Sequence, residues 1–577
     1  MPKAKIGRTK RRRNRPQLTT EERERRKAAR KHKTDIRTTF INAGFEHIKT
    51  RDKHFTVFDR RGEIDAIYAY ENIVVCVEDT QTSRQEDIVD HLRKKVEYTQ
   101  HLAGHQDEFL QVLRREFPIF RGYVRRHAQY STPEYHVVHV YSSMNTLDKI
   151  HKSRYATTFR FLDYPCLQYF LTISRTIHRS TRFELIKFLG LSLKDIGADL
   201  SGADSTTYEA LLLPETASSF PTGHKLVSFL VDPRMLLERS YVLRSDSWMD
   251  SDCLYQRLLS RNKINSMREY LVKEGRVFVN NIIATLPAGC QITDREEKRL
   301  DGTAITKIVP VHISIPREFN AIGIIDGQHR LYSYHEGDDR FDGKIEPLRG
   351  KQHLLVTGIV YPKHIPPAKR QRFEAQLFLE INDKQKRVRG DLKQAIERIV
   401  QPHSPIAIAK AVVQGLAETG PLTGRLEVHF YDTGKIKTTS IVSYGMRHIV
   451  SLDGEHSLFK RWTNKQKKTI QKNRSVLEVY VDHCVSEINM FLGAFKSALP
   501  GDMWTTDRKK SRALTTTTIN GLIFCLRLLI EKDALGDFDY YRAGFSNMKV
   551  SFKPERFTYR SSHWKSLGEE LFEQCFT

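Results

Sequence analysis

The segment Ala321 to Arg330, AIGIIDGQHR, passes from an apolar stretch to a polar one that begins a helix. Its first five residues predict a short buried strand, and the apolar positions Leu331, Tyr332 and Tyr334 continue with helical spacing. Other strand-like and helix-like segments follow one another along the chain. We therefore predict a mixed α/β (α+β) fold.

The turn at Asp326 to Arg330 has the chemistry of a phosphate-binding site. The first N–H groups of a helix lack intrahelical partners and carry the positive end of the helix dipole. Gly327 lets an anion approach the backbone, and His329 and Arg330 add donors suited to phosphate oxygens. The alternative is a structural ion pair between Asp326 and Arg330 that pins the turn. The residue types alone favour neither interpretation.

Two ordered motifs give the chain a resemblance to a known family. Asp326 to Arg330 matches the signature of the DGQHR-domain family, which includes DndB-like proteins associated with DNA phosphorothioate modification. Downstream, Phe378 to Val388 (FLEINDKQKRV) is similar to the F-x-x-I-N-x-x-Q-K-x-V pattern of that family. Two motifs in the right order are more specific than either one alone.

The resemblance implies a ligand. The family is similar to the ParB and sulfiredoxin superfamily, in which a Gly-x-x-Arg turn holds nucleotide phosphates, and Gly327 and Arg330 occupy that pattern. It also resembles the D-G-Q-Q-R motif of NTP-dependent modified-DNA restriction proteins, with His329 in place of the second Gln. ATP or another NTP is then the expected ligand. The candidate nucleotide-binding residues are Asp326, Gly327, Gln328, His329, Arg330, Asn382 and Gln385. Without the resemblance, Asn382 and Gln385 are helix-cap and turn residues.

Bulk properties narrow the class of protein. A chain of 577 residues is long enough for two to four domains. No apolar run approaches the about 20 residues of a membrane span, and the N-terminus lacks the apolar segment of a secretion signal. The seven cysteines are scattered, which argues against a disulfide framework or a structural zinc site. We expect a cytoplasmic protein without a membrane partner.

Positive charge is concentrated at the N-terminus. Residues 1–33 hold fifteen Lys or Arg against three Glu, so they carry +12 of the net charge of +25. We predict that this stretch is a disordered basic tail that neutralises DNA phosphates with release of counterions. Its candidate DNA-binding residues are Lys10, Arg11, Arg12 and Arg13. The alternative is a solubilising or targeting extension.

Residues 34–150 carry the pattern of a nuclease-like domain. The expected order is one helix, three strands and a second helix, at Asp35–Ile48, His54–Phe58, Glu63–Tyr70, Ile73–Val77 and Arg84–Leu102. This order, completed by a strand at Tyr135–Tyr141, resembles the αβββαβ core of restriction endonucleases with a PD-(D/E)xK motif. The resemblance places Asp65 and Glu78 in the acidic positions.

Asp65 and Glu78 on neighbouring strands are candidate catalytic residues and Mg²⁺ ligands, with Glu46 on the preceding helix as a further ligand. The motif is incomplete, because Thr80 stands where the family has a lysine. Lys94 or Lys95 on the next helix is the candidate replacement for that ammonium group. The alternatives are solvated strand-end carboxylates, or a degenerate nuclease that only binds DNA.

The rest of the chain divides by its patterns. Residues 151–219 form a connecting region, 220–400 a ParB/sulfiredoxin-like DGQHR domain, and 401–577 a mostly helical region. Helical periodicity in the last region is expected at Ile406–Ala417, Asn464–Leu499 and Thr515–Ile530.

The motifs together predict a DNA-binding and nucleotide-binding DGQHR protein of a prokaryotic DNA-modification or phage-defence system, with Mg²⁺-dependent DNA cleavage under NTP control. Two alternatives stay open. One is a non-catalytic, DndB-like transcriptional regulator with a degenerate nuclease domain, and the other is a DNA-stimulated NTPase. The expected partners are DNA, nucleotide and other proteins of the same system. The sequence is also compatible with a homo-oligomer.

Overall fold

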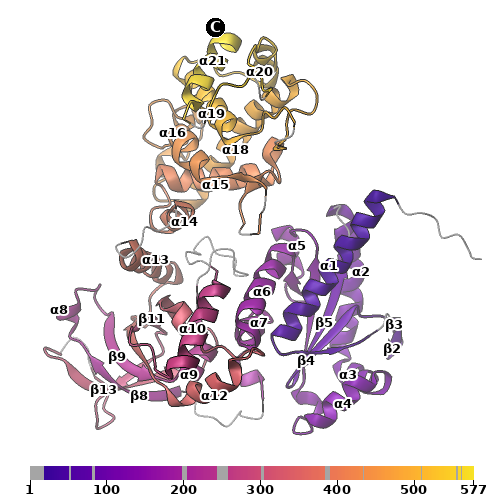
Figure 1. Ribbon diagram of the computed structural model, residues 1–577, viewed down its shortest axis with the longest axis vertical. Helices are drawn as coiled ribbons and strands as arrows, with labels where there is room; N and C mark the ends of the chain where they lie inside the picture. The colour runs from indigo at the N-terminus through magenta and orange to yellow at the C-terminus, as the bar shows by residue number, and fades with distance from the viewer. Residues whose placement is uncertain are drawn as a thin grey trace, which may run out of the picture. The chain divides into compact units, whose positions relative to one another are not determined.

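We describe the protein from a computed structural model (Figure 1). The residues described are 19–50, 53–80, 85–197, 205–242, 258–300, 305–383, 390–429, 431–432, 434–507, 510–553, 556–560 and 562–577. The chain divides into two units. The first comprises Met1–Arg175 with Lys194–Leu200, and the second Thr176–Leu193 with Ser201–Thr577. Each unit contains both helices and a β-sheet, which confirms the predicted mixed α/β class.

The first helix, α1, spans Thr20–Asn42 and differs from the expected helix at both ends. It starts fifteen residues earlier because Thr19 and Glu22 form a capping box, which satisfies free N–H groups at the helix start. It ends before Gly44, whose φ of +95° is a common way to terminate a helix. Residues Glu46–Ile48 then form strand β1. The basic stretch after Thr19 is therefore helical, and the prediction of disorder up to residue 33 is wrong there.

A five-stranded sheet forms the centre of the first unit in the order β1-β4-β5-β6-β7. Strands β1, β4 and β5 pair antiparallel, whereas β5, β6 and β7 pair parallel. The later strands are β4 (Ala66–Tyr70), β5 (Ile73–Thr80), β6 (His136–Ser143) and β7 (Arg160–Leu162). A separate hairpin joins β2 (Phe55–Val57) to β3 (Arg60–Gly62).

Helices cover both faces of this sheet. On one face, α1 stacks Phe40 on Tyr68 of β4 at 4.5 Å between ring centroids. On the other, α2 buries Leu92 and Val96 in a cluster with Tyr141 of β6. Because side chains alternate along a strand, successive residues of β5 face α1 and α2 in turn. The helices after β5 are α2 (Gln85–Gly104), α3 (Gln106–Glu116), α4 (Pro118–Arg126), α5 (Lys149–Arg154) and α6 (Tyr164–Ile177).

In the described part of the second unit, eight strands form a mixed sheet in the order β10-β14-β11-β15-β9-β8-β13-β12. Its bounds are β8 (Ser205–Leu212), β9 (Lys225–Val231), β10 (Ser240–Tyr241), β11 (Ile282–Leu286), β12 (Gln291–Thr293), β13 (Val309–Pro316), β14 (Ile322–Asp326) and β15 (Leu354–Val360). Its helices are α7 (Thr181–Phe188), α8 (Glu215–Ser218), α9 (Pro233–Arg239), α10 (Arg261–Glu274), α11 (Gln328–Tyr332), α12 (Asp342–Lys351) and α13 (Pro367–Asp383). The region 151–219, expected only to connect domains, thus contributes helices and one strand of this sheet.

The C-terminal part of the second unit is mostly helical, as expected. Its helices are α14 (Gly390–Val400), α15 (Pro405–Glu418), α16 (Arg447–Ile449), α17 (Leu458–Arg461), α18 (Arg474–Ala498), α19 (Thr516–Glu531), α20 (Phe538–Phe545) and α21 (Trp564–Phe576). A π-helical turn spans Ile441–Met446, and β16 (Leu426–Glu427) pairs with β17 (Ile436–Lys437). Across the described residues, we find no helix with the length and apolar character needed to cross a bilayer.

Candidate functional site

The two acidic residues predicted from the sequence, Asp65 and Glu78, lie side by side near the C-terminal end of β5. Glu78 lies on β5 and is 2% exposed. Asp65 precedes β4, and Ala66 pairs with Val77, so Asp65 comes next to Glu78 across the two strands. The Asp65 carboxylate raises the pKa of Glu78, as expected for two acidic side chains on neighbouring strand positions. Asp65 Oδ2 also accepts a hydrogen bond from the backbone N–H of Asp79 at 3.0 Å, which fixes its direction.

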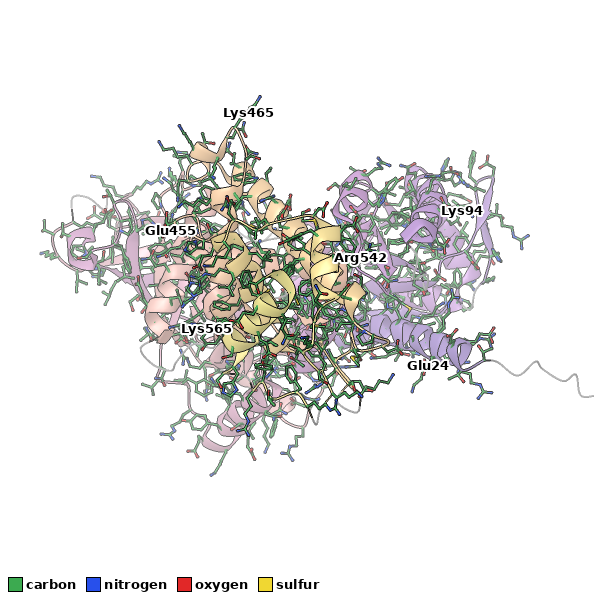
Figure 2. The ribbon with its side chains drawn as sticks, turned by 90° about the horizontal axis from the view of Figure 1, so that it is seen from above. Glu24, Lys94, Glu455, Lys465, Arg542 and Lys565 are labelled. Carbon is green, nitrogen blue, oxygen red and sulfur yellow. The ribbon has the colours of Figure 1, made fainter. Side chains whose placement is uncertain are left out.

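Lys95 brings an ammonium group to this pair from α2. Its Nζ lies 2.5 Å from Glu78 Oε2, and its side chain is 19% exposed. Packing of Leu92 and Val96 against the sheet sets the rotation of α2 and so turns Lys95 inward. Lys94 is separated from Lys95 by about 100° around the helix axis, and its side chain is exposed, as Figure 2 shows. Of the two candidate lysines, Lys95 is the one that contacts Glu78.

The electrostatics of Glu78 depend on its surroundings. Burial raises the pKa of Glu78 to about 8, the Lys95 ammonium opposes this rise, and the nearby Asp65 carboxylate adds to it. Two carboxylates this close repel when both are ionised, so a proton or a cation between them is favoured.

A second ammonium group at the site was not anticipated from the sequence. Lys33 of α1 places Nζ 3.3 Å from Asp79 Oδ1 and 3.8 Å from Asp65 Oδ1. Asp79 follows Glu78 on β5 and therefore faces the opposite side of the sheet, toward α1. The signal that would have found Lys33 is the capping box at Thr19, because it extends the helix through this residue.

Glu46 does not join the pair. It lies on strand β1 and not on a helix, and it pairs with Ala69 of β4, about 13 Å along the strand from Asp65. Its Oε1 accepts a hydrogen bond from Arg126 Nη2 at 2.6 Å, and both side chains are exposed. Glu46 is therefore not positioned to share a metal ion with Asp65 and Glu78.

The donor set at Asp65 and Glu78 fits Mg²⁺ better than a metal that needs a full protein cage. Among the described residues, no group of three or more His, Cys, Asp or Glu side chains is arranged to hold a metal ion. Mg²⁺ is commonly held by one or two carboxylates and completes its shell with water and substrate phosphate oxygens. Two converging carboxyl groups at the end of a strand satisfy that requirement.

The strand, turn and helix predicted around Asp326 are all present. β14 ends at Asp326, Gly327 has a φ of +98°, and α11 begins at Gln328. A side chain at Gly327 would be strained, and its Cβ would lie 3.0 Å from Arg330 Nη2. The N–H of Ser260 lies 3.3 Å from His329 Nε2.

The ion pair proposed as an alternative for this turn is formed. Arg330 Nη2 donates to Asp326 Oδ2 at 2.7 Å and to the carbonyl oxygen of Asn281 at 2.8 Å. Asn382 lies near the end of α13, and its Nδ2 donates to the carbonyl oxygen of Phe378 at 2.9 Å within the same helix. Gln385 and the tail residues Lys10, Arg11, Arg12 and Arg13 lie outside the described residues.

Comparison of the chain with protein-family models, with curated proteins and with solved structures gives no match.

Proposed function

We propose that the first unit is a Mg²⁺-dependent DNA endonuclease of the PD-(D/E)xK type, within a DGQHR-like protein of a prokaryotic DNA-modification or phage-defence system. The observation that carries this proposal is the meeting of Asp65, Glu78 and the Lys95 ammonium at one strand end. The expected lysine is absent from β5, and its charge is supplied from α2.

The topology supports the same proposal. In the first unit, α1, the antiparallel strands β1, β4 and β5, helix α2 and the parallel strand β6 follow in the order of an αβββαβ core, with the hairpin β2–β3 inserted before β4 and helices α3 and α4 before β6. The expected first strand at His54–Phe58 lies in that hairpin, and β1 takes its place in the sheet. The acidic residues stand before the second of these sheet strands and near the end of the third, where the PD-(D/E)xK resemblance places them.

Each residue has a role set by its position. Asp65 and Glu78 would hold Mg²⁺, which when bound offsets phosphate charge and activates water. Glu78 must lose its proton to bind the ion, so binding is favoured as the pH rises toward about 8. Lys95 lies beside Glu78 and can donate to a phosphate oxygen as negative charge develops there. Lys33 holds Asp79 and Asp65 from the α1 side.

The exposed half of α1 supports DNA as the substrate. Residues 19–28 are all exposed, and Figure 2 shows Glu24 near the N-terminal end of the helix. Between Thr20 and Lys33 the helix carries seven Lys or Arg residues against three Glu. Cations on a solvated helix neutralise phosphates at little desolvation cost. Because Lys33 also contacts Asp65 and Asp79, this basic helix leads directly to the proposed catalytic residues.

The double substitution Arg25→Gln and Arg26→Gln is expected to weaken binding to non-specific duplex DNA. The slope of log K against log salt should become shallower by about 0.9 for each phosphate that the variant no longer neutralises. Fluorescence anisotropy of the full chain over a salt series, in EDTA, measures both quantities. Lys465→Gln with Lys468→Gln removes two exposed charges from the C-terminal part and serves as the matched control. Equal slopes for wild type and both variants would argue against a role of α1 in DNA binding.

We propose nucleotide binding at the Asp326 turn from the motif resemblance. Substitution of either partner of the Asp326–Arg330 ion pair tests this proposal directly. Asp326→Asn frees Arg330 and removes a negative charge, so it should increase affinity for ATP if Arg330 contacts phosphate. Arg330→Gln should reduce that affinity by about 10-fold to 100-fold. Isothermal titration calorimetry of the full chain checks both. If ATP binds wild type and both variants equally, the turn is only a structural ion pair.

The proposed function is tested by incubating the full chain with plasmid and linear DNA in Mg²⁺ or EDTA. Nicked or linear products in Mg²⁺ alone are expected. DNA binding without any product under a range of divalent ions would instead support the non-catalytic regulator. Phosphate release from ATP stimulated by DNA, again without cleavage, would support the NTPase alternative.

A further inference from the structure

A cavity of about 550 Å³ lies in the C-terminal helical part, far along the sequence from the residues considered above. Figure 2 labels Glu455 of its lining and the neighbouring Lys565. The wall is formed by residues of α14, the start of α15, the segment from α16 to His456, and α19. Its lining residues with charged or basic side chains are Glu397, Arg447, His448, Glu455, His456 and Arg527.

The fold brings two arginines together at this cavity. The π-helical turn Ile441–Met446 packs so closely on α19 that a Cβ at Gly445 would lie 2.6 Å from Asn520 Oδ1. Arg447 follows the turn directly, and Arg527 lies two helical turns beyond Asn520 on α19. Single π-helical turns inside helical regions often occur at functional sites.

The two arginines of the cavity are not paired with the two glutamates, Glu397 and Glu455, that also line it. In the described part of the chain, neither Arg447 nor Arg527 pairs with a carboxylate, and Arg447 Nε donates to His448 Nε2 at 3.1 Å. Partial burial, together with the charges of Arg447, Arg527 and Lys565, lowers the pKa of His448. Both arginines are half-buried, so water screens their mutual repulsion only in part.

The N-terminus of α15 adds partial positive charge to the same cavity. Ser404 caps this helix by accepting from Ala407 N–H at 3.1 Å, and its hydroxyl donates to Glu397 Oε1 at 2.7 Å. Pro405 and Ile406, the first two helical residues, line the cavity. A fourteen-residue helix directs the positive end of its dipole at this point.

We propose that this cavity binds a phosphate monoester attached to a nucleoside, with the phosphate held by Arg447 and Arg527. Planar guanidinium groups match phosphate oxygens in geometry and charge. The volume lies in the range of small-molecule sites and is large enough for a mononucleotide. Glu455 and Glu397 accept hydrogen bonds from sugar hydroxyl or base amino groups, and Ile406 offers an apolar contact. This site is independent of the proposed cleavage chemistry.

The same phosphate monoester occurs in a free nucleotide and at the 5′ end of a DNA strand. The test is calorimetry of the full chain in EDTA with AMP, with inorganic phosphate, and with a short DNA strand carrying either a 5′-phosphate or a 5′-hydroxyl. We expect AMP to bind more tightly than inorganic phosphate. Arg447→Gln and Arg527→Gln should each weaken AMP binding by about 10-fold or more. Lys465→Gln, which removes an exposed charge away from the cavity, should leave it unchanged.

Ile406→Trp provides a second variant, because it fills the cavity without removing charge, and circular dichroism checks the fold of every variant. Repeating the AMP titrations in the Arg330→Gln background removes any contribution of the Asp326 turn, and the effects of Arg447→Gln and Arg527→Gln should persist there. A preference for the 5′-phosphorylated strand, abolished in Arg447→Gln, would identify the strand end as the source of the phosphate. Absence of binding by all phosphates, or AMP binding that is equal in wild type and the cavity variants, would overturn the proposal.

Discussion

Asp65→Asn is expected to reduce Mg²⁺-dependent DNA cleavage by at least about 10³-fold, equivalent to about 4 kcal/mol of transition-state stabilisation. The amide removes the negative charge needed to hold Mg²⁺, yet its oxygen can still accept the hydrogen bond from Asp79 N–H. The fold and DNA binding should therefore be retained. Single-turnover cleavage of a labelled duplex, with anisotropy as the binding control, measures the two effects separately.

Asp59→Asn is the matched control for this substitution, because its side chain is 80% exposed and it lies in the turn between β2 and β3. Its cleavage rate should equal that of wild type. Full activity of Asp65→Asn would remove Asp65 and Glu78 from the proposed mechanism, whereas loss of DNA binding as well would indicate misfolding.

Lys95→Met is expected to lower the cleavage rate by about 10²-fold to 10³-fold, the usual effect of removing one electrostatic contact to a transition state. It should also move the pH profile. Glu78 has a pKa of about 8 despite the opposing Lys95 ammonium, so loss of that ammonium raises the pKa further. In the proposed mechanism cleavage requires ionised Glu78, so activity that rises through pH 8 in wild type should rise only at higher pH in the variant.

Lys94→Met tests whether the position of the ammonium matters or only the number of charges. The two lysines are adjacent on α2, but Lys94 is exposed and Lys95 contacts Glu78. We expect Lys94→Met to keep the wild-type rate and pH profile. If both variants lose activity equally, Lys95 acts through general charge and has no specific place in the site.

Local patterns predicted several elements well. The strand before Asp326, its glycine turn and the following helix are present, as is the helix that carries Lys95. These features depend on periodicity and on a glycine at positive φ, which neighbouring residues determine. The sequence also identified Lys95 as one of two candidates, and only the packing of α2 on the sheet distinguishes it from Lys94.

Other features were not predicted. Some depend on a helix-start pattern inside a highly charged segment, and others on contacts between residues far apart in the sequence. The capping box at Thr19 lies inside a basic run, which made the start of α1 look like a solvated tail. Glu46 was placed on a helix because the termination signal at Gly44 was not recognised. Arg447 and Arg527 are eighty positions apart, and no local pattern relates them.

The alternation of Glu78 and Asp79 along β5 makes the site sensitive to changes in chain length. Glu78 forms an ion pair with Lys95 on α2, and Asp79 forms one with Lys33 on α1. The end of β5 is therefore bonded to the helices on both faces of the sheet. Eight consecutive residues of β5 pair in register with β6. Inserting or deleting a single residue in the turn between β4 and β5 would leave that pairing intact but shift Asp65 relative to Glu78. Natural variation in this turn should therefore keep a constant length even where its residues change.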